Sequence, residues 1–229
     1  MKVILFVCFL IAACMVMKNL SFYYFIAGEI RALRTENIQN TPSYSKRVNI
    51  IQTTFEELSS SPSLIILGDS IAFRLAEFAK INLATNSILN GGIAGDTVQN
   101  LKTRITTEYL TAKVPVLIII GTNDVGNNLP EQSFVDELSD IIDIFHNQNL
   151  YIVSIINASS WKRDNSKIDC YNEKIRELVN KNSNVSFVDA NKLLLTDCSV
   201  INDCLIDGIH LNNRGNEILL TEIAYSIGI

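Results

Sequence analysis

Two short motifs far apart in the chain contain the residue types that together perform nucleophilic catalysis. Ser70 follows the apolar run 64–67 within Gly-Asp-Ser-Ile, and Asp207 and His210 belong to Asp-Gly-Ile-His near the end of the 229 residues. A serine hydroxyl needs an imidazole to accept its proton and a third group to orient that imidazole. These motifs predict Ser70 as nucleophile, His210 as base and Asp207 as the orienting carboxylate. The alternative at this point is an Asp/His pair that only caps the last helix.

The histidine content limits the choice of base, because the chain contains only His146 and His210. His146 ends the amphipathic stretch 134–145, where the dipole of a helix C-terminus favours an imidazole at the surface. The chain is expected to form a parallel sheet, described below, and the end of that helix should lie at the edge of the sheet opposite the one where ligands bind. His210, in a loop three residues after an aspartate, is therefore the predicted base.

Composition and charge exclude several functional classes. The net charge is −5 and no long Lys/Arg cluster occurs, whereas binding of nucleic-acid phosphates needs a basic face. No His or Cys falls in a ligand-like spacing, so no metal site is expected, and we predict no organic cofactor. The length fits one domain with an N-terminal extension.

The N-terminal segment is the one membrane-like stretch of the sequence. Residues 3–27 are apolar except for Lys18, Asn19 and Ser21, and a helix of that length would measure about 37 Å, enough to cross a bilayer with tilt. No clean small-x-small cleavage site follows, so we interpret residues 1–27 as an uncleaved signal anchor, a transmembrane helix that places the rest of the chain on the extracytoplasmic side. Two alternatives remain: a secreted protein with a cleaved signal peptide, and a lipoprotein lipidated at Cys14.

The spacing of two cysteines bears on the segment before the predicted base. Cys198 and Cys204 bracket a short stretch just upstream of Asp207. A disulfide between them would stiffen that segment in an oxidising compartment. Two unpaired thiols are the equally open alternative.

Hydrophobic patterning predicts the organisation of the remaining chain. Residues 28–62 are a polar linker that includes an amphipathic helix, and residues 63–229 form the main domain. In that domain short apolar runs alternate with helical stretches, which is typical of βαβ units around a parallel sheet covered on both faces. The predicted strands are 64–67, 88–90, 116–120, 151–156 and 185–188, and the predicted helices are 71–80, 97–107, 131–147, 167–181 and 213–226.

Glycine-rich or polar segments follow the first three strands and precede the last helix. They are residues 68–70, 91–96, 121–124 and 207–210. Ligands of open α/β sheets bind beyond the carboxyl ends of the strands, so these segments are expected to meet at one edge. Asp96 begins an Asp-Thr-Val-Gln capping box, which predicts a structural role for it.

These four segments together resemble the motifs of the SGNH hydrolases, also called GDSL-type esterases. Ser70 matches the nucleophile block, Gly95 the glycine block, Asn123 the asparagine block, and Asp207 with His210 the last block. The resemblance implies a flavodoxin-like α/β fold, a three-layer α/β/α sandwich with a five-stranded parallel sheet, here preceded by the N-terminal apolar helix. It also implies an acyl-enzyme mechanism with an oxyanion hole formed by the N–H groups of Ser70 and Gly95 and the amide of Asn123.

The chain departs from the family pattern near the nucleophile. Ile71 stands where the family name has leucine, and residues 72–74 lack the threonine often seen there, which leaves the shape of the acyl pocket open. Trp161, followed by two basic residues, either contacts a substrate headgroup or glycan or packs within its loop.

The sequence thus predicts a membrane-anchored serine esterase of the cell envelope. Its expected substrates are acyl esters, either O-acetylated glycans or lysolipids. Acyl transfer to an envelope glycan and a non-catalytic glycan-binding or scaffold domain are the alternatives. Acyl length and oligomeric state are not determined by the sequence.

Overall fold

A computed structural model describes residues 42–58, 62–83 and 87–228. The predicted signal anchor at residues 1–27 lies outside this part of the chain. Among the helices of the described ranges, none combines the length and apolar character that a membrane crossing requires.

Five parallel strands form a single sheet at the centre of the domain. Their order is β2-β1-β3-β4-β5, the flavodoxin-like order, and each is joined to the next by a segment that contains helix. Burial on both faces explains the continuous apolar runs, since the side chains of residues 64–67 are fully buried. The predicted five-stranded parallel sheet is confirmed, with strands β1 (Leu64–Gly68), β2 (Ile88–Gly92), β3 (Val116–Ile119), β4 (Leu150–Val153) and β5 (Val185–Val188).

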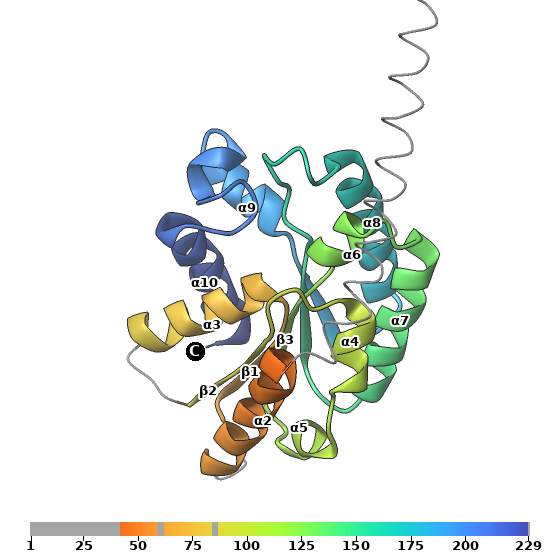
Figure 1. Cartoon of the computed structure of the whole chain (residues 1–229), viewed down its shortest axis with the longest axis vertical. Helices are drawn as coiled ribbons and strands as arrows, with labels where there is room; N and C mark the ends of the chain where they lie inside the picture. Colours follow the sequence, from red (N-terminus) through yellow and green to blue (C-terminus); the bar gives the residue numbers. More distant parts are fainter. Residues whose placement is uncertain (1–41, 59–61, 84–86, 229) are drawn as a thin grey trace, which may run out of the picture. The chain divides into compact units, whose positions relative to one another are not determined.

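Helices cover both faces of this sheet (Figure 1). On one face, Ile71, Leu75 and Leu219 of the covering helices join Leu64 and Ile66 of β1 in a single core. That face has α3 (Ser70–Asn82), α9 (Ala190–Asp197) and α10 (Asn213–Ile227), and the other has α4 (Val98–Thr103), α7 (Glu131–Ile144) and α8 (Asn165–Val179).

The amphipathic helix predicted before the first strand is α2 (Pro42–Glu57), and it packs on the domain. Its buried residues include Tyr44, Ile51 and Phe55, and the Phe55 ring meets Tyr109 edge-on with centroids 5.6 Å apart. Tyr109 belongs to the short helix α5 (Thr107–Thr111), which leads into β3.

The helix predicted over 97–107 is divided in the structure into α4 and α5. Arg104 ends α4 with non-helical dihedrals, and its guanidinium turns inward to bind the carboxylate of Asp96 and the carbonyl of Gly68. The β-branched run 105–107 that follows has low helix propensity. A buried ion pair therefore interrupts a pattern that looks continuous in sequence.

Strand β4 ends at Val153 instead of continuing to residue 156. The side chain of Asn172 accepts a hydrogen bond from the N–H of Ile155 at 2.7 Å and donates to its carbonyl at 2.9 Å. An amide side chain thus replaces a neighbouring strand as the partner of this backbone. The chain is released from the sheet to form the loop 154–164.

Candidate active site

Ser70 lies at the first turn of α3, directly after β1, at the carboxyl edge of the sheet. Asp69 caps the helix by accepting a hydrogen bond from the N–H of Ile71 at 2.8 Å. The turn requires glycine at position 68, where φ is +139° and an added Cβ would lie 1.8 Å from the carbonyl oxygen of Ile119. This strand-to-helix turn presents the half-buried Ser70 beyond the sheet edge.

The motif Asp-Gly-Ile-His forms a tight loop organised by its own aspartate. Oδ1 of Asp207 accepts hydrogen bonds from the N–H groups of Ile209, at 3.1 Å, and His210, at 2.8 Å. The N–H of Ile206 donates to the carbonyl of His210 at 2.8 Å and closes the loop. The positions of the carboxylate and the imidazole relative to each other are thus fixed locally.

The fold brings this loop against Ser70, 140 residues earlier in the chain. Ser70 Oγ lies 2.8 Å from Nε2 of His210, and Nδ1 of His210 lies 2.7 Å from Oδ2 of Asp207. An ionised carboxylate can only accept, so Nδ1 carries a proton and the neutral ring leaves Nε2 free to accept from the serine hydroxyl. The three side chains form one hydrogen-bonded line in the order nucleophile, base, carboxylate.

The environment of Asp207 keeps its carboxylate charged. Partial burial opposes ionisation, but the hydrogen bonds from the His210 backbone, the imidazole and the Ile209 backbone outweigh it and lower the pKa of Asp207 to about 2. Asp207 is therefore ionised at neutral pH and can stabilise an imidazolium.

The loops that contain Gly95 and Asn123 meet at the same sheet edge. Asn123 starts the short helix α6 (Thr122–Gly126), and its Nδ2 donates to the carbonyl of Asp96 at 2.9 Å. That bond joins the loop after β3 to the loop that contains Gly95, and a second amide hydrogen remains on Nδ2. In the described part of the chain, neither the N–H of Ser70 nor that of Gly95 donates to another protein group. All three of the predicted oxyanion donors thus have a hydrogen available.

A buried ion pair supports the loop between Gly95 and α4. Asp96 is fully buried, and its Oδ2 lies 2.7 Å from Nη2 of Arg104, while Tyr44 donates to its Oδ1 at 3.4 Å. The predicted structural role of Asp96 agrees with these contacts, but the predicted capping box is wrong. Thr97 caps α4 instead, by accepting from the N–H of Asn100. No sequence pattern indicates that Arg104 or Tyr44 would reach this loop.

Two further carboxyl groups are buried behind the nucleophile. Burial raises the pKa of Asp69 to about 7, and the neighbouring charge of Asp96 adds to the shift. Burial likewise raises the pKa of Asp124 to about 7, although the N–H of Val98 donates to its carboxylate at 3.1 Å. Sequence reasoning missed both acids, because each follows a motif residue and looks like part of a polar loop.

Cys198 and Cys204 form a disulfide, which resolves the alternative left open by the sequence. Their Cα atoms are 6.0 Å apart, and both residues are fully buried. The bridge joins the end of α9 to the 3₁₀ helix η1 (Ile201–Cys204), two residues before the loop that begins at Ile206. It therefore restrains the segment that leads into Asp207.

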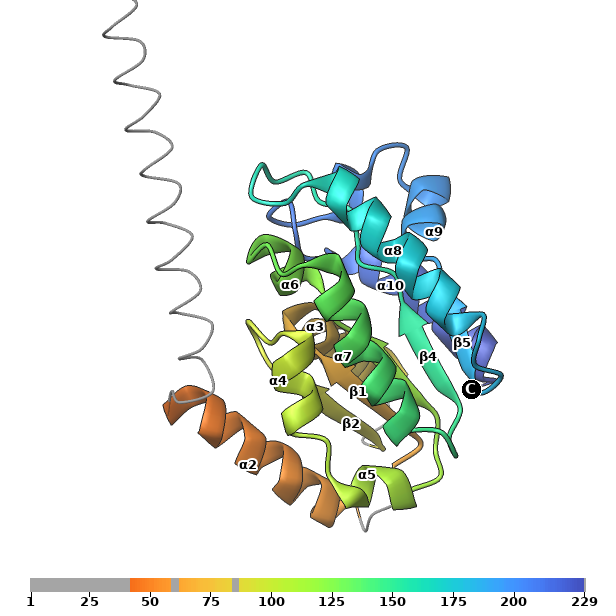
Figure 2. The same cartoon turned by 90° about the vertical axis from the view of Figure 1, so that its right-hand side faces the viewer.

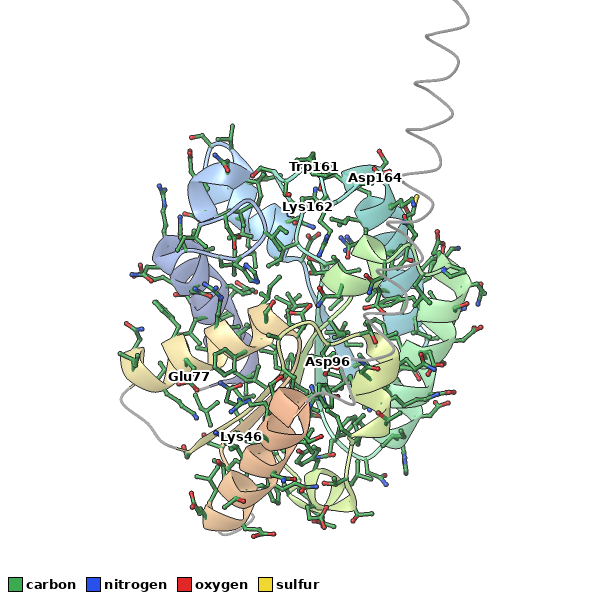
Figure 3. All side chains as sticks on the ribbon, viewed as in Figure 1. Lys46, Glu77, Asp96, Trp161, Lys162 and Asp164 are labelled. Atoms are coloured by element: carbon green, nitrogen blue, oxygen red, sulfur yellow. A yellow bond between two sulfur atoms is a disulfide. The ribbon has the colours of Figure 1, made fainter. Side chains whose placement is uncertain are left out.

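His146 and Trp161 lie outside this arrangement. His146 is exposed just after α7, and its Nδ1 bonds the carbonyl of Asp143 at 2.9 Å. Trp161 is 83% exposed on the loop after β4, and Figure 3 shows it with Lys162 near the upper edge of the described domain. Within its loop, Trp161 has Lys162 Nζ at 6.0 Å from its ring centroid, and whether it contacts a substrate stays a prediction.

Comparison with known proteins agrees with this architecture. The family model described as GDSL-like Lipase/Acylhydrolase family matches residues 66–218. That range includes the hydrogen-bonded Ser70, His210 and Asp207. It also includes Gly95 and Asn123, the other two predicted oxyanion donors. No curated protein sequence matches the chain significantly.

Several solved structures share the fold at low sequence identity. A proposed platelet activating factor from Streptococcus pneumonia is 22% identical with a TM-score of 0.68, and covers 86% of this chain and 99% of its own. A GDSL-like lipase from Bacteroides thetaiotaomicron is 19% identical with a TM-score of 0.65, at 80% and 98% coverage. The acetylxylan esterase Axe2 from Geobacillus stearothermophilus is 20% identical with a TM-score of 0.55, at 72% and 94% coverage.

Proposed function

Because the chain belongs to the GDSL-like lipase/acylhydrolase family, we propose that it is a serine esterase that hydrolyses carboxylic esters through an acyl-enzyme. The observation that supports this function most directly is the line from Ser70 Oγ through His210 to Asp207, with contacts of 2.8 and 2.7 Å. A binding module has no need for a serine hydroxyl aligned with an imidazole and a carboxylate.

The geometry supports the following acylation step. Ser70 Oγ forms a bond to the ester carbonyl carbon while its proton moves to Nε2 of His210. The charge that develops on the carbonyl oxygen is stabilised by the N–H groups of Ser70 and Gly95 and by the free amide hydrogen of Asn123. His210, paired with the Asp207 carboxylate, then gives its proton to the leaving alkoxide as the carbon–oxygen bond breaks.

Deacylation repeats these roles with water. His210 removes a proton from a water molecule, which attacks the acyl carbon of the Ser70 ester. The proton is then returned to Ser70 Oγ as the carboxylic acid leaves. Among ester substrates we propose acyl esters of the cell envelope, either O-acetylated glycans or lysolipids and other acyl esters, because an envelope anchor at residues 3–27 would keep them within reach.

The test is hydrolysis of p-nitrophenyl acetate by the full chain and by Ser70→Ala, with Ser226→Ala as the matched control. Ser226 is an exposed serine on α10, and its Oγ bonds Glu222. We expect Ser70→Ala to abolish the reaction and labelling by a fluorophosphonate probe, while Ser226→Ala retains both. Equal rates in Ser70→Ala and the parent protein would refute the proposal.

A further inference from the structure

Exposed apolar side chains gather beside the candidate active site. Trp161, Ile206 and Val200 are 83%, 64% and 56% exposed, and we call them the apolar rim. They lie on neighbouring segments at the carboxyl edge of the sheet, which is at the top in Figures 2 and 3.

Hydrogen bonds fix the segments of the apolar rim to the loop that contains Asp207 and His210. The N–H groups of Ser159 and Ser160 both donate to the carbonyl of Gly208, at 3.0 and 3.2 Å. Ser159 Oγ also donates to Asn202 at 2.8 Å, which ties the loop after β4 to the 3₁₀ helix η1. The apolar rim is therefore a fixed part of the site's entrance.

Exposed apolar groups grouped around a site indicate a surface that is covered in use. Tryptophan is favoured where one side is apolar and the other wet, as at the boundary of a lipid bilayer. The aliphatic Ile206 and Val200 suit hydrocarbon better than a sugar, which presents hydroxyls as well as an apolar face.

The exposed charges beside the apolar rim are of both signs. Lys162 is exposed, and its Nζ lies 6.0 Å from the centroid of the Trp161 ring. Asp164, Asp203 and the ionised Asp207 are exposed on the same segments. Such a surface suits a zwitterionic bilayer, because it lacks the cluster of Lys and Arg side chains that anionic headgroups attract.

The described chain also begins at this edge of the sheet. Near the start of α2, Arg47 donates to the carbonyls of Asn90 and Gly92 at the carboxyl end of β2, at 2.8 and 3.2 Å. The end of α2 packs through Phe55 on Tyr109, on the side where the strands begin. Helix α2 therefore begins on the side of the candidate active site, and the apolar stretch 3–27 precedes it in the sequence.

We propose that the apolar rim of Trp161, Ile206 and Val200 docks on the surface of a zwitterionic phospholipid bilayer and turns the entrance of the candidate active site toward the lipid headgroups. The segment 28–41 between the apolar stretch and α2 spans at most about 50 Å, so a domain anchored through residues 3–27 would stay close to the surface. Docking would present Ser70 to esters at the membrane surface.

Trp161 is the only tryptophan in the chain, so its fluorescence tests this proposal directly. The full chain is incubated with phosphatidylcholine vesicles, with and without lipids brominated on the acyl chains, and bound protein is isolated by sedimentation. We expect a blue shift of the emission and quenching by the brominated lipid. Bound protein whose emission is neither shifted nor quenched would overturn the proposal, since attachment would then be through another part of the chain. Protein that does not sediment with the vesicles would overturn it as well.

Paired variants provide a second test. Trp161→Ser/Ile206→Ser removes most of the apolar rim, and Tyr225→Ser/Ile81→Ser is the matched control. Tyr225 and Ile81 are 85% and 77% exposed near the far ends of α10 and α3, away from the carboxyl edge.

The readout is the ratio of lysophosphatidylcholine hydrolysis in vesicles to p-nitrophenyl acetate hydrolysis in solution. We expect at least a fivefold fall in this ratio for Trp161→Ser/Ile206→Ser and no change for the control. An equal ratio in all proteins would overturn the proposal. The hydrolysis ratio rests on the proposed esterase function, whereas the fluorescence experiment can also be done with the Ser70→Ala variant. Failure of the membrane-docking proposal can therefore be distinguished from failure of the esterase proposal.

Discussion

Replacing Asp69 by asparagine is expected to stabilise the protein above neutral pH and to leave its stability near pH 4 almost unchanged. Asp69 is fully buried, and in the described residues its Oδ2 has no hydrogen-bond partner. Burial raises its pKa from 3.8 to about 7, with a contribution from the charge of Asp96. Asparagine has the same shape, keeps the oxygen that caps Ile71, and cannot ionise.

The sign and the size of the expected change in the free energy of unfolding follow from proton linkage. Between pH 4 and pH 7 the folded protein retains a proton on Asp69 that the unfolded chain has lost, so the free energy of unfolding falls as the pH rises. At about 1.4 kcal/mol per unit of pKa, the shift corresponds to about 4 kcal/mol for this residue. The pKa of Asp207 is instead lowered to about 2, so its ionised form stabilises the folded protein. This stabilisation is present at neutral pH and is lost only as the pH falls below about 4.

The assay is urea unfolding followed by circular dichroism at half-unit intervals from pH 4 to pH 8. We expect the decline in the free energy of unfolding over this range to be about 4 kcal/mol smaller in Asp69→Asn than in the parent protein. Asp143→Asn, which removes an exposed carboxylate on α7, is the control and should follow the parent curve. Parallel curves for Asp69→Asn and the parent would refute the argument that burial disfavours the Asp69 charge.

Two further substitutions test the donors and the ion pair beside the site. Asn123→Ala should lower kcat for p-nitrophenyl acetate by about 10²–10³, because it removes one oxyanion donor, whereas Asn128→Ala in the next loop should not. A fall in kcat below tenfold would contradict this role. Arg104→Met should lower the free energy of unfolding by about 3–5 kcal/mol, because the Asp96 charge stays buried without its partner, and adding Asp96→Asn should restore much of the loss. If the double variant were no more stable than Arg104→Met, the unpaired charge would not be the cause.

The sheet could be predicted because the sequence pattern of each strand is local. Each strand is a short apolar run that needs only its own side chains to be recognised, and the loops with Ser70, Gly95 and Asn123 directly follow three of these runs. Since parallel strands place their carboxyl ends at one edge, the convergence of these loops follows from strand order alone.

The elements that sequence patterns missed depend on distant partners. The division of 97–107 into α4 and α5 reflects the Arg104–Asp96 pair, and the end of β4 reflects Asn172 on a helix 17 residues later. Neither side chain differs in the sequence from an ordinary surface residue. Only burial distinguishes them.

The sequence by itself determined which residues lie at the sheet edge, because strand periodicity and the glycine turns are properties of a few consecutive residues. The tertiary structure alone decided that Ser70 Oγ and His210 Nε2 meet at 2.8 Å, that Cys198 and Cys204 are paired, and that Asp69 is sealed from solvent. Contact distances and desolvation arise only when separate segments pack together, and desolvation sets the protonation of the acids behind the nucleophile.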